Sequence, residues 1–329
     1  MEKSMNEILI ETTVNQAIKR IQDDPERSTR NLIDIGLHFS EGRFQLSFLQ
    51  LAQKMLEDEQ SAYYRMIPDV MANVDGKRIV TFGMNVGYHS CTKGARKIRE
   101  IEELSHFNIP WCISLEMESL TYWQHSDDYH KLLEDGEALG IYTWIIYSLD
   151  DTHHLLELAE DFPDSAFIFS CAPKEITDNL LDEASNLYNI MFAVEYSEGI
   201  EEACQLLRNR KFLYSVLYNY GANDKDTILN GQILMELETL HPIFSFFKAD
   251  MDCPFDIQTD IYHYVRDARL EQNYQTLPFD IIYDNLFIDS IVSDDSIALS
   301  IDANGNSVSC NLFEQSIVEI LKLQFPKKS

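Results

Sequence analysis

Six short apolar runs, each followed by an amphipathic stretch, constrain the fold of this chain more than any other feature of its sequence. The runs are rich in β-branched and aromatic residues, and they occupy 109–117, 141–147, 166–171, 190–194, 212–218 and 243–247. Their starts lie roughly 20 to 30 residues apart, a spacing typical of strand–helix units whose strands pair in parallel through right-handed crossovers. We therefore predict an α/β fold in which these units curl into a partial (β/α)6 barrel of the TIM type.

The stretches between the runs have the features of helices. Several begin with Asp, Thr or Glu, which are common at helix starts. Their apolar residues recur three or four positions apart, and they occupy 127–140, 152–162, 177–187 and 199–210. The barrel is expected to span 78–254.

Two further segments flank the predicted barrel. Residues 1–77 are expected to be an N-terminal helical segment. Ser40 is suited to cap a helix there, and that helix has one apolar face, formed by Phe44, Phe48, Leu51, Ala52 and Met55. Residues 255–329 are expected to be a small C-terminal extension. Within it, Asn304-Gly305 predicts a tight hairpin between two alternating strands.

The charge of the chain excludes two classes of partner. Lys and Arg total 26 against 55 Asp and Glu, a formal charge of −29, which repels phosphate backbones and anionic lipid. We therefore expect neither nucleic acid nor membrane as a partner. The apolar runs are far shorter than the roughly 20 residues that span a bilayer. The N-terminal stretch has no apolar block of the kind found in secretion signals, so we expect a cytoplasmic protein.

No two of the six cysteines have a CxxC or CxxxC spacing; they are Cys91, Cys112, Cys171, Cys204, Cys253 and Cys310. Sequence-local zinc and iron–sulfur motifs depend on such close spacing. We expect Cys112 and Cys171, which lie on apolar strands, to be buried structural residues.

Several segments, taken in chain order, resemble the radical S-adenosylmethionine (SAM) superfamily, in particular members with a cysteine-containing C-terminal extension. Residues 82–116 resemble the helix and "iPf" phrase before the first barrel strand of these proteins. Residues 136–151 resemble their second strand and its "GGE" turn, and 164–178 resemble their third strand and its "TNG" turn. IDANGNSVSC, at 301–310, resembles the hairpin of their extension. The resemblance implies a partial barrel of the radical SAM type.

The sequence departs from this family where the family holds its cofactors. The segment ESLTYWQHSDDYHKLL replaces the CxxxCxxC loop, and Cys310 matches one cysteine of the extension. The resemblance implies that altered SAM-site positions are Ser148, Asp150, Asp151 and Ser170. Since a [4Fe–4S] cluster needs three thiolates, we expect no cluster and no resident cofactor, while SAM binding stays open.

Acidic residues and histidines follow the predicted strands, at the edge where barrel active sites gather. One interpretation is a metal site made by His125, Asp151 and His153. The alternative is that the acidic residues cap helices. Asp250, Asp252 and Cys253 follow the last predicted strand, either as a site for a cation or an amine or as an ordinary acidic loop.

The retained architecture and the lost cofactor motifs together suggest a function. We expect a catalytically inactive relative of radical SAM enzymes, acting as an accessory or specificity subunit for an active enzyme or its precursor peptide. Two alternatives stay open. One is an enzyme that reuses the barrel mouth without a cluster, and the other is a protein that binds SAM or another metabolite.

Overall fold

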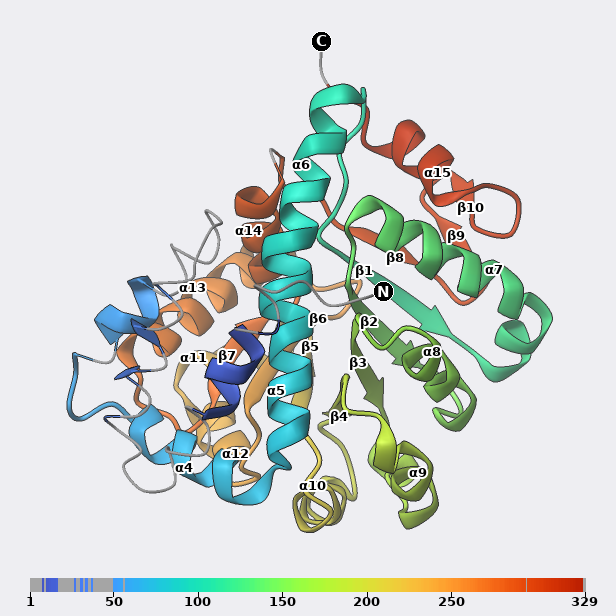
Figure 1. The fold of residues 1–329 in the computed structure, drawn as a ribbon. Helices are drawn as coiled ribbons and strands as arrows, with labels where there is room; N and C mark the ends of the chain where they lie inside the picture. Colours follow the sequence, from blue (N-terminus) through green and yellow to red (C-terminus); the bar gives the residue numbers. More distant parts are fainter. Residues whose placement is uncertain are drawn as a thin grey trace.

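The computed structural model describes residues 8, 10–16, 27, 30–31, 33–34, 37, 50–55, 57–293 and 295–327. In these residues a sheet of eight parallel strands has the order β7-β6-β5-β4-β3-β2-β1-β8 (Figure 1). The strands are β1 (Cys112–Met117), β2 (Thr143–Ser148), β3 (Ala166–Cys171), β4 (Ile190–Glu195), β5 (Tyr214–Tyr220), β6 (Phe244–Ala249), β7 (Leu277–Asp280) and β8 (Leu299–Ile301). Strands β1 to β7 are neighbours both in the chain and in the sheet, as successive strand–helix units require.

Helices connect consecutive strands. Those after β1 to β4 are α7 (Ser119–Leu139), η2 (His153–Leu155), α8 (Leu156–Asp161), η3 (Pro173–Glu175), α9 (Asp178–Glu183), η4 (Ala184–Asn186) and α10 (Ile200–Asn209). Those after β5 to β7 are η5 (Ala222–Asp224), α11 (Lys225–Leu229), α12 (Gln232–Glu238), α13 (Phe255–Glu271) and α14 (Tyr283–Val292), and α15 (Ile317–Gln324) follows the last strands of the chain. Before β1 lie α4 (Tyr63–Asn73), α5 (Gly76–Met84), the π-helix η1 (Asn85–Gly94) and α6 (Ala95–Leu104).

The continuous helix formed by α5, η1 and α6 packs against the amino ends of the strands. Asn85 Nδ2 donates to the carbonyl oxygens of Pro163 and Ser165, just before β3, at 2.9 and 2.8 Å. The hydroxyls of Ser90 and Thr143, the first residue of β2, lie 2.7 Å apart. This helix therefore covers the amino end of the sheet, and any ligand is expected at the carboxyl end, which we call the mouth.

The sheet is strongly curled. Neighbouring strands lie about 4.8 Å apart, so β2 and β6, four positions apart in the sheet, would be roughly 19 Å apart if it were flat. Lys248 Nζ on β6 nevertheless lies 3.8 Å from the ring centroid of Tyr147 on β2. The two side chains face each other across the concave side of the sheet, which confirms the predicted α/β partial barrel.

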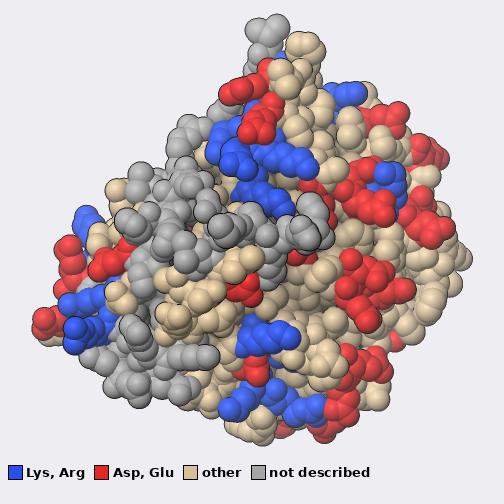
Figure 2. Space-filling model, in the orientation of Figure 1, with Lys and Arg blue, Asp and Glu red and all other residues tan. Residues whose placement is uncertain are grey.

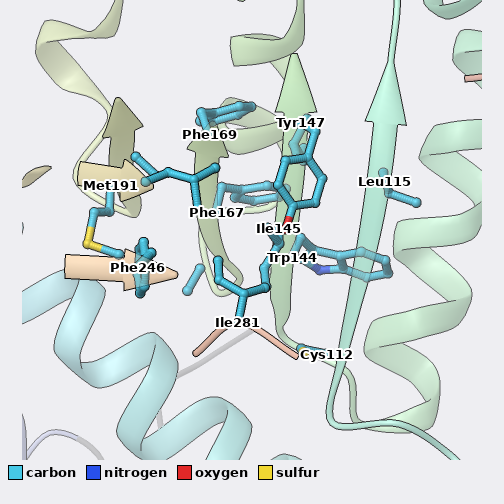
Figure 3. Packing of buried hydrophobic residues seen from close by; sticks show 14 of the residues in the cluster. Cys112, Leu115, Trp144, Ile145, Tyr147, Phe167, Phe169, Met191, Phe246 and Ile281 are labelled. Atoms are coloured by element: carbon cyan, nitrogen blue, oxygen red, sulfur yellow. The ribbon is translucent and has the colours of Figure 1, made fainter. Parts of the chain in front are cut away.

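An apolar layer fills the concave side below these two residues. Ile145 and Phe246 each precede one of them by two positions, so they lie on the same face of the sheet. They belong, with Met191 and Ile281, to the buried hydrophobic core (Figure 3). The concave side is therefore a packed core at depth and polar at the mouth.

The sheet continues beyond residue 254, where the sequence suggested that the barrel ended. β7 has four residues and β8 has three, so both are too short to stand out as apolar runs. Gly305, with φ +78°, turns the chain where Asn304-Gly305 predicted a turn. β8, however, pairs in parallel with β1, and the hairpin is formed by β9 (Asn306–Ser307) and β10 (Cys310–Asn311).

The predicted N-terminal helix is described in part. Residues 50–55 are helical, which includes Leu51, Ala52 and Met55. Ser40, Phe44 and Phe48 lie outside the described residues. Within the described part of the chain, no helix combines the length and the apolar character needed to cross a bilayer.

Gly136 in α7 lies against a buried ring of the sheet. A Cβ at this position would be 2.6 Å from Cζ2 of Trp144, which is fully buried on β2. Alanine in a helix interior normally stabilises by about 1 kcal/mol relative to glycine, but overpacking a core costs about 1–3 kcal/mol. We expect Gly136→Ala to lower the free energy of unfolding, measured with urea. Gly83→Ala in α5 is the control, because nothing lies within 4 Å of a Cβ there, and it should not destabilise.

Candidate functional site

Polar side chains from five strands gather on the concave side at the mouth. They are Glu116 on β1, Tyr147 on β2, Ser170 on β3, Glu195 on β4 and Lys248 on β6, and we call them the mouth cluster. Glu116 is in register with Tyr147, and Tyr147 with Ser170, so these three share one face. Glu195 pairs with Leu217 and Leu217 with Phe246, two residues before Lys248, which places Glu195 and Lys248 on that face too.

Burial dominates the electrostatics of the mouth cluster. Desolvation lowers the pKa of Lys248, although the charges of Glu116, Glu195 and Asp250 oppose that shift. Desolvation also raises the pKa of Tyr147. Lys248 Nζ lies over the Tyr147 ring, a cation–π contact, and has no carboxylate of a described residue within ion-pair distance.

The mouth cluster contains one buried hydroxyl group without a hydrogen-bond partner in the described part of the chain, that of Ser170. Ser170 is 1% exposed, and its Oγ has no hydrogen-bond partner among the described residues. The side chains of Glu116 and Tyr147 likewise make no hydrogen bond to another described residue. A buried hydroxyl without a partner costs about 1–3 kcal/mol, so Ser170 is better suited to a ligand than to the packing of the chain alone.

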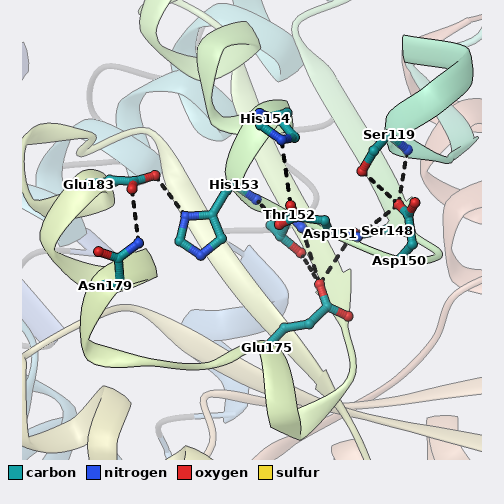
Figure 4. Close-up of polar contacts among 10 residues, drawn as sticks. All are labelled: Ser119, Ser148, Asp150, Asp151, Thr152, His153, His154, Glu175, Asn179 and Glu183. Carbon is teal, nitrogen blue, oxygen red and sulfur yellow. Dashed lines mark hydrogen bonds and ion pairs between the residues drawn. The ribbon is translucent and has the colours of Figure 1, made fainter. Parts of the chain in front are cut away.

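A second polar group lies in the turns after β2 and β3 and is largely satisfied (Figure 4). Asp150 accepts hydrogen bonds from the main-chain N and the Oγ of Ser119, both at 2.9 Å, and from Asp151 N at 2.8 Å. Burial alone would raise the pKa of Asp150, but these hydrogen bonds lower it. Since Ser119 is the first residue of α7, Asp150 fixes the start of that helix to the turn after β2.

Glu175 joins the turn after β2 to the turn after β3. Its Oε2 accepts from Thr152 Oγ1 at 2.7 Å, from Thr152 N at 3.2 Å and, weakly, from Ser148 Oγ at 3.5 Å (Figure 4). Its Oε1 accepts from Ala172 N at 3.3 Å. Burial raises the pKa of Glu175. Of the altered SAM-site positions, Ser148, Asp150 and Asp151 therefore belong to these turns, and Ser170 belongs to the mouth cluster.

The three residues considered as a metal site have different partners. His125 Nδ1 lies 2.9 Å from Asp128 Oδ2, and the ring stacks on Phe313. His153 Nδ1 lies 2.7 Å from Glu183 Oε2. Asp151 accepts from His153 N at 3.0 Å, a local capping contact. The described residues that do bring three ligand atoms together are His130, Glu157 and Asp161, which lie on α7 and α8.

The residues after β6 lie close together but form no group of three potential metal ligands among the described residues. Asp250 and Asp252 are exposed, whereas Cys253 is buried. Asp250 N donates to the carbonyl oxygen of Tyr220, which ends β5. The structure gives these three residues no shared partner among the described residues, so they remain a loop at the rim of the mouth.

All six cysteines lie in the described part of the chain, and each is buried as a free thiol. They lie on or next to different elements, and none belongs to a group of three potential metal ligands in that part. Burial raises the pKa of Cys91 to about 12 and that of Cys112 and Cys171 well above the usual range. Metal ligation needs the thiolate. Among the described residues, no three of these thiols lie together as potential metal ligands.

The contribution of the hydrogen bonds between Ser119 and Asp150 can be tested by measuring the free energy of unfolding. Asp150→Ala removes the acceptor for both Ser119 donors, which acts as a helix cap, so we expect a loss of about 1 kcal/mol in the free energy of unfolding. Asp252→Ala is the matched control, because Asp252 is exposed at the other side of the mouth. Equal urea midpoints for the two variants would contradict the capping role.

Comparisons with known proteins give no family. No protein-family model matches the chain, and no curated protein matches its sequence. The chain is similar at 10% identity to the crystal structure of Streptococcus suis SuiB bound to S-adenosylmethionine, with a TM-score of 0.48 over 70% of this chain and 67% of SuiB. A second crystal structure of Streptococcus suis SuiB matches at 10% identity with a TM-score of 0.47, over 98% of this chain and 82% of SuiB.

Proposed function

We propose that this protein is an accessory subunit that performs no radical SAM chemistry itself and docks beside an active enzyme through the rim of its mouth. One observation carries the proposal. Glu118 alone separates β1 from α7, and Asp150 holds the first residue of that helix. The sequence resemblance places a three-cysteine loop at this position, where the chain has neither a thiol nor a loop.

An apolar patch at the same position supports a protein partner. Leu120 and Trp123, three residues apart on α7, are 67% and 60% exposed, and Leu149 in the turn after β2 is 50% exposed. Leu149 N donates to the carbonyl oxygen of Met117, which brings that turn to the start of α7. Trp123 also packs edge-on against His154. Exposed apolar groups gathered in this way are typical of protein–protein contacts.

The charge around the apolar patch suggests which surface binds it. Glu118, Asp150 and Asp151 border the patch, and the chain as a whole has a formal charge of −29. Acidic side chains gather over α7, α8 and α9 in Figure 2. Complementary charge steers association, so we propose that the partner enzyme presents a basic surface with an apolar centre.

The absence of radical chemistry is tested by anaerobic reconstitution of the full chain with iron and sulfide. We expect the desalted protein to hold no stoichiometric iron or sulfide and to lack the visible absorption of a thiolate-bound cluster, because its thiols are buried and dispersed. A stable, stoichiometric cluster would overturn this part of the proposal.

The partner is tested by crosslinking and affinity purification of the tagged chain from its own cells. We expect one enzyme to be recovered reproducibly, and less of it at high salt. The double variant Leu120→Ser/Trp123→Ser should lose it. Leu104→Ser should retain it, because Leu104 is 90% exposed at the end of α6, away from the mouth. A chain that stays monomeric and alone, or a double variant that behaves like the control, would count against the accessory role.

SAM binding is tested separately. Asp150 and Asp151 are engaged in local hydrogen bonds, so we propose that these positions no longer hold SAM. Calorimetric titration of SAM into the protein should give no saturable heat. Saturable binding that is weakened by Ser170→Ala would show instead that a SAM site persists at the mouth.

A further inference from the structure

Lys248 and Lys225 have different surroundings. Lys225 forms an ion pair with Asp260 at 2.7 Å, as expected for a lysine in a chain with 55 acidic residues. Lys248 is part-buried and has no such pair with a described residue, and its Nζ lies over the ring of Tyr147 instead. It therefore presents an amine toward the concave side without a fixed counter-ion.

Burial lowers the cost of deprotonating the Lys248 amine relative to an exposed lysine. Burial lowers the pKa of Lys248, and the nearby charges of Glu116, Glu195 and Asp250 only oppose this in part. A neutral amine has a lone pair and is a nucleophile, and desolvation is one of the ways in which proteins activate lysine. The cluster thus contains an amine that feels the charges of Glu116, Glu195 and Asp250.

The hydroxyls of the cluster offer donors for a bound oxygen atom. Ser170 Oγ is buried without a partner, and Ser170 is in register with Tyr147, the residue beneath the Lys248 amine. A carbonyl oxygen would accept a hydrogen bond from either hydroxyl. Such a bond would both orient the ligand and polarise its carbonyl carbon for attack.

We propose that Lys248 is the reactive amine of a carbonyl-binding site, and that the mouth holds a small aldehyde or ketone as an imine. The amine lone pair forms a C–N bond to the carbonyl carbon as the C=O π pair moves onto oxygen. A carboxylate, Glu116 or Glu195, takes one proton from the nitrogen and passes it to that oxygen, which becomes a hydroxyl. The same carboxylate passes the second N–H proton to the hydroxyl, which leaves as water while the C=N bond forms, without an oxidant or a reductant.

The acidic groups also define the ligand class. Glu116 and Glu195 flank the amine and repel anions, so the ligand is expected to be neutral or cationic. This site uses different residues from those of the apolar patch, so the inference goes beyond the accessory role and can fail independently of it.

The test is reductive trapping of the full chain with glycolaldehyde and cyanoborohydride at pH 7, followed by peptide mass spectrometry. We expect Lys248 to be labelled at least about fivefold faster than the exposed Lys174, although burial alone would slow it. Lys248→Arg should remove the adduct at this position without new labelling nearby. In urea, both lysines should react at equal rates.

Ser170→Ala separates a binding site from packing. Because Ser170 Oγ has no partner among the described residues, the variant should unfold at the same or higher urea concentration. If Ser170 binds the carbonyl oxygen, labelling of Lys248 should fall several-fold while labelling of Lys174 stays unchanged. Labelling of Lys248 that is no faster than that of Lys174 in the folded protein would overturn the inference.

Discussion

Arg269→Leu should lower the free energy of unfolding by about 3–5 kcal/mol, since breaking a buried ion pair leaves an uncompensated charge. Arg269 on α13 donates from Nη1 and Nη2 to the two carboxylate oxygens of Asp284, at 2.8 and 2.7 Å. Asp284 is 3% exposed, and its remaining bond comes from Asp280 N at 2.8 Å. Guanidinium or urea unfolding at pH 7 measures the loss.

A matched control lies on the same helix. Arg266 pairs with Asp267, but the two side chains are 43% and 54% exposed, and exposed pairs contribute about 0–1 kcal/mol. Arg266→Leu should therefore change stability little. The double variant Arg269→Leu/Asp284→Leu should recover part of the loss, because no charge is left buried. If Arg269→Leu were no more destabilising than Arg266→Leu, the pair would not anchor α13 to α14.

The parts of the fold that the sequence predicted are those with a strong local pattern. β1 to β6 match the six apolar runs because their strands are buried on both faces, which removes polar interruptions. β7 contains Pro278 within four residues, and β8 looked like half of a hairpin. Which strand lies beside β1 depends on long-range packing, so a local pattern could not place β8.

The candidate site was less predictable from the sequence. Ser170 was singled out only because it lies in a segment that resembles the third strand and turn of a known family. Glu116, Glu195 and Lys248 were missed, since each is one charged residue at the end of an apolar strand. They meet only because the sheet curls, with three strands between β2, which carries Tyr147, and β6, which carries Lys248. The available signal was their position: each lies at or near the carboxyl end of its strand, where barrel sites form.

Asp289 on α14 joins the two strands at one edge of the barrel. Its Oδ1 accepts from Trp111 N, before β1, and its Oδ2 from Ile297 N, before β8, both at 2.8 Å. The side chain is fully buried, and burial raises its pKa to about 8, although both hydrogen bonds oppose the shift. Asp289→Asn keeps one acceptor but turns its amide toward the other N–H, so we expect a loss of about 1–3 kcal/mol at low pH.

The pH dependence of that loss is the sharper prediction. The unfolded-state pKa of an aspartate is about 3.9, and the folded value of about 8 is higher. The folded state therefore holds the proton more tightly than the unfolded state, and the stability from this group is full below about pH 4 and declines as pH rises toward 8. The decline is at most about 1.4 kcal/mol per pH unit.

Burial also raises the pKa of Asp280, to about 6, so this residue titrates in the same pH range. Asparagine does not titrate, so comparing the unmodified protein with Asp289→Asn separates the contribution of Asp289 from that of Asp280. The advantage of the unmodified protein over Asp289→Asn, measured by urea unfolding, should shrink steadily between pH 5 and pH 8, whereas the difference caused by the exposed Asp252→Asn should stay flat. A constant difference for Asp289→Asn would mean that Asp289 is ionised throughout. In that case the hydrogen bonds from Trp111 N and Ile297 N, rather than burial, would determine the charge of Asp289. A carboxylate would then hold β8 beside β1, the strand that carries Glu116 to the mouth.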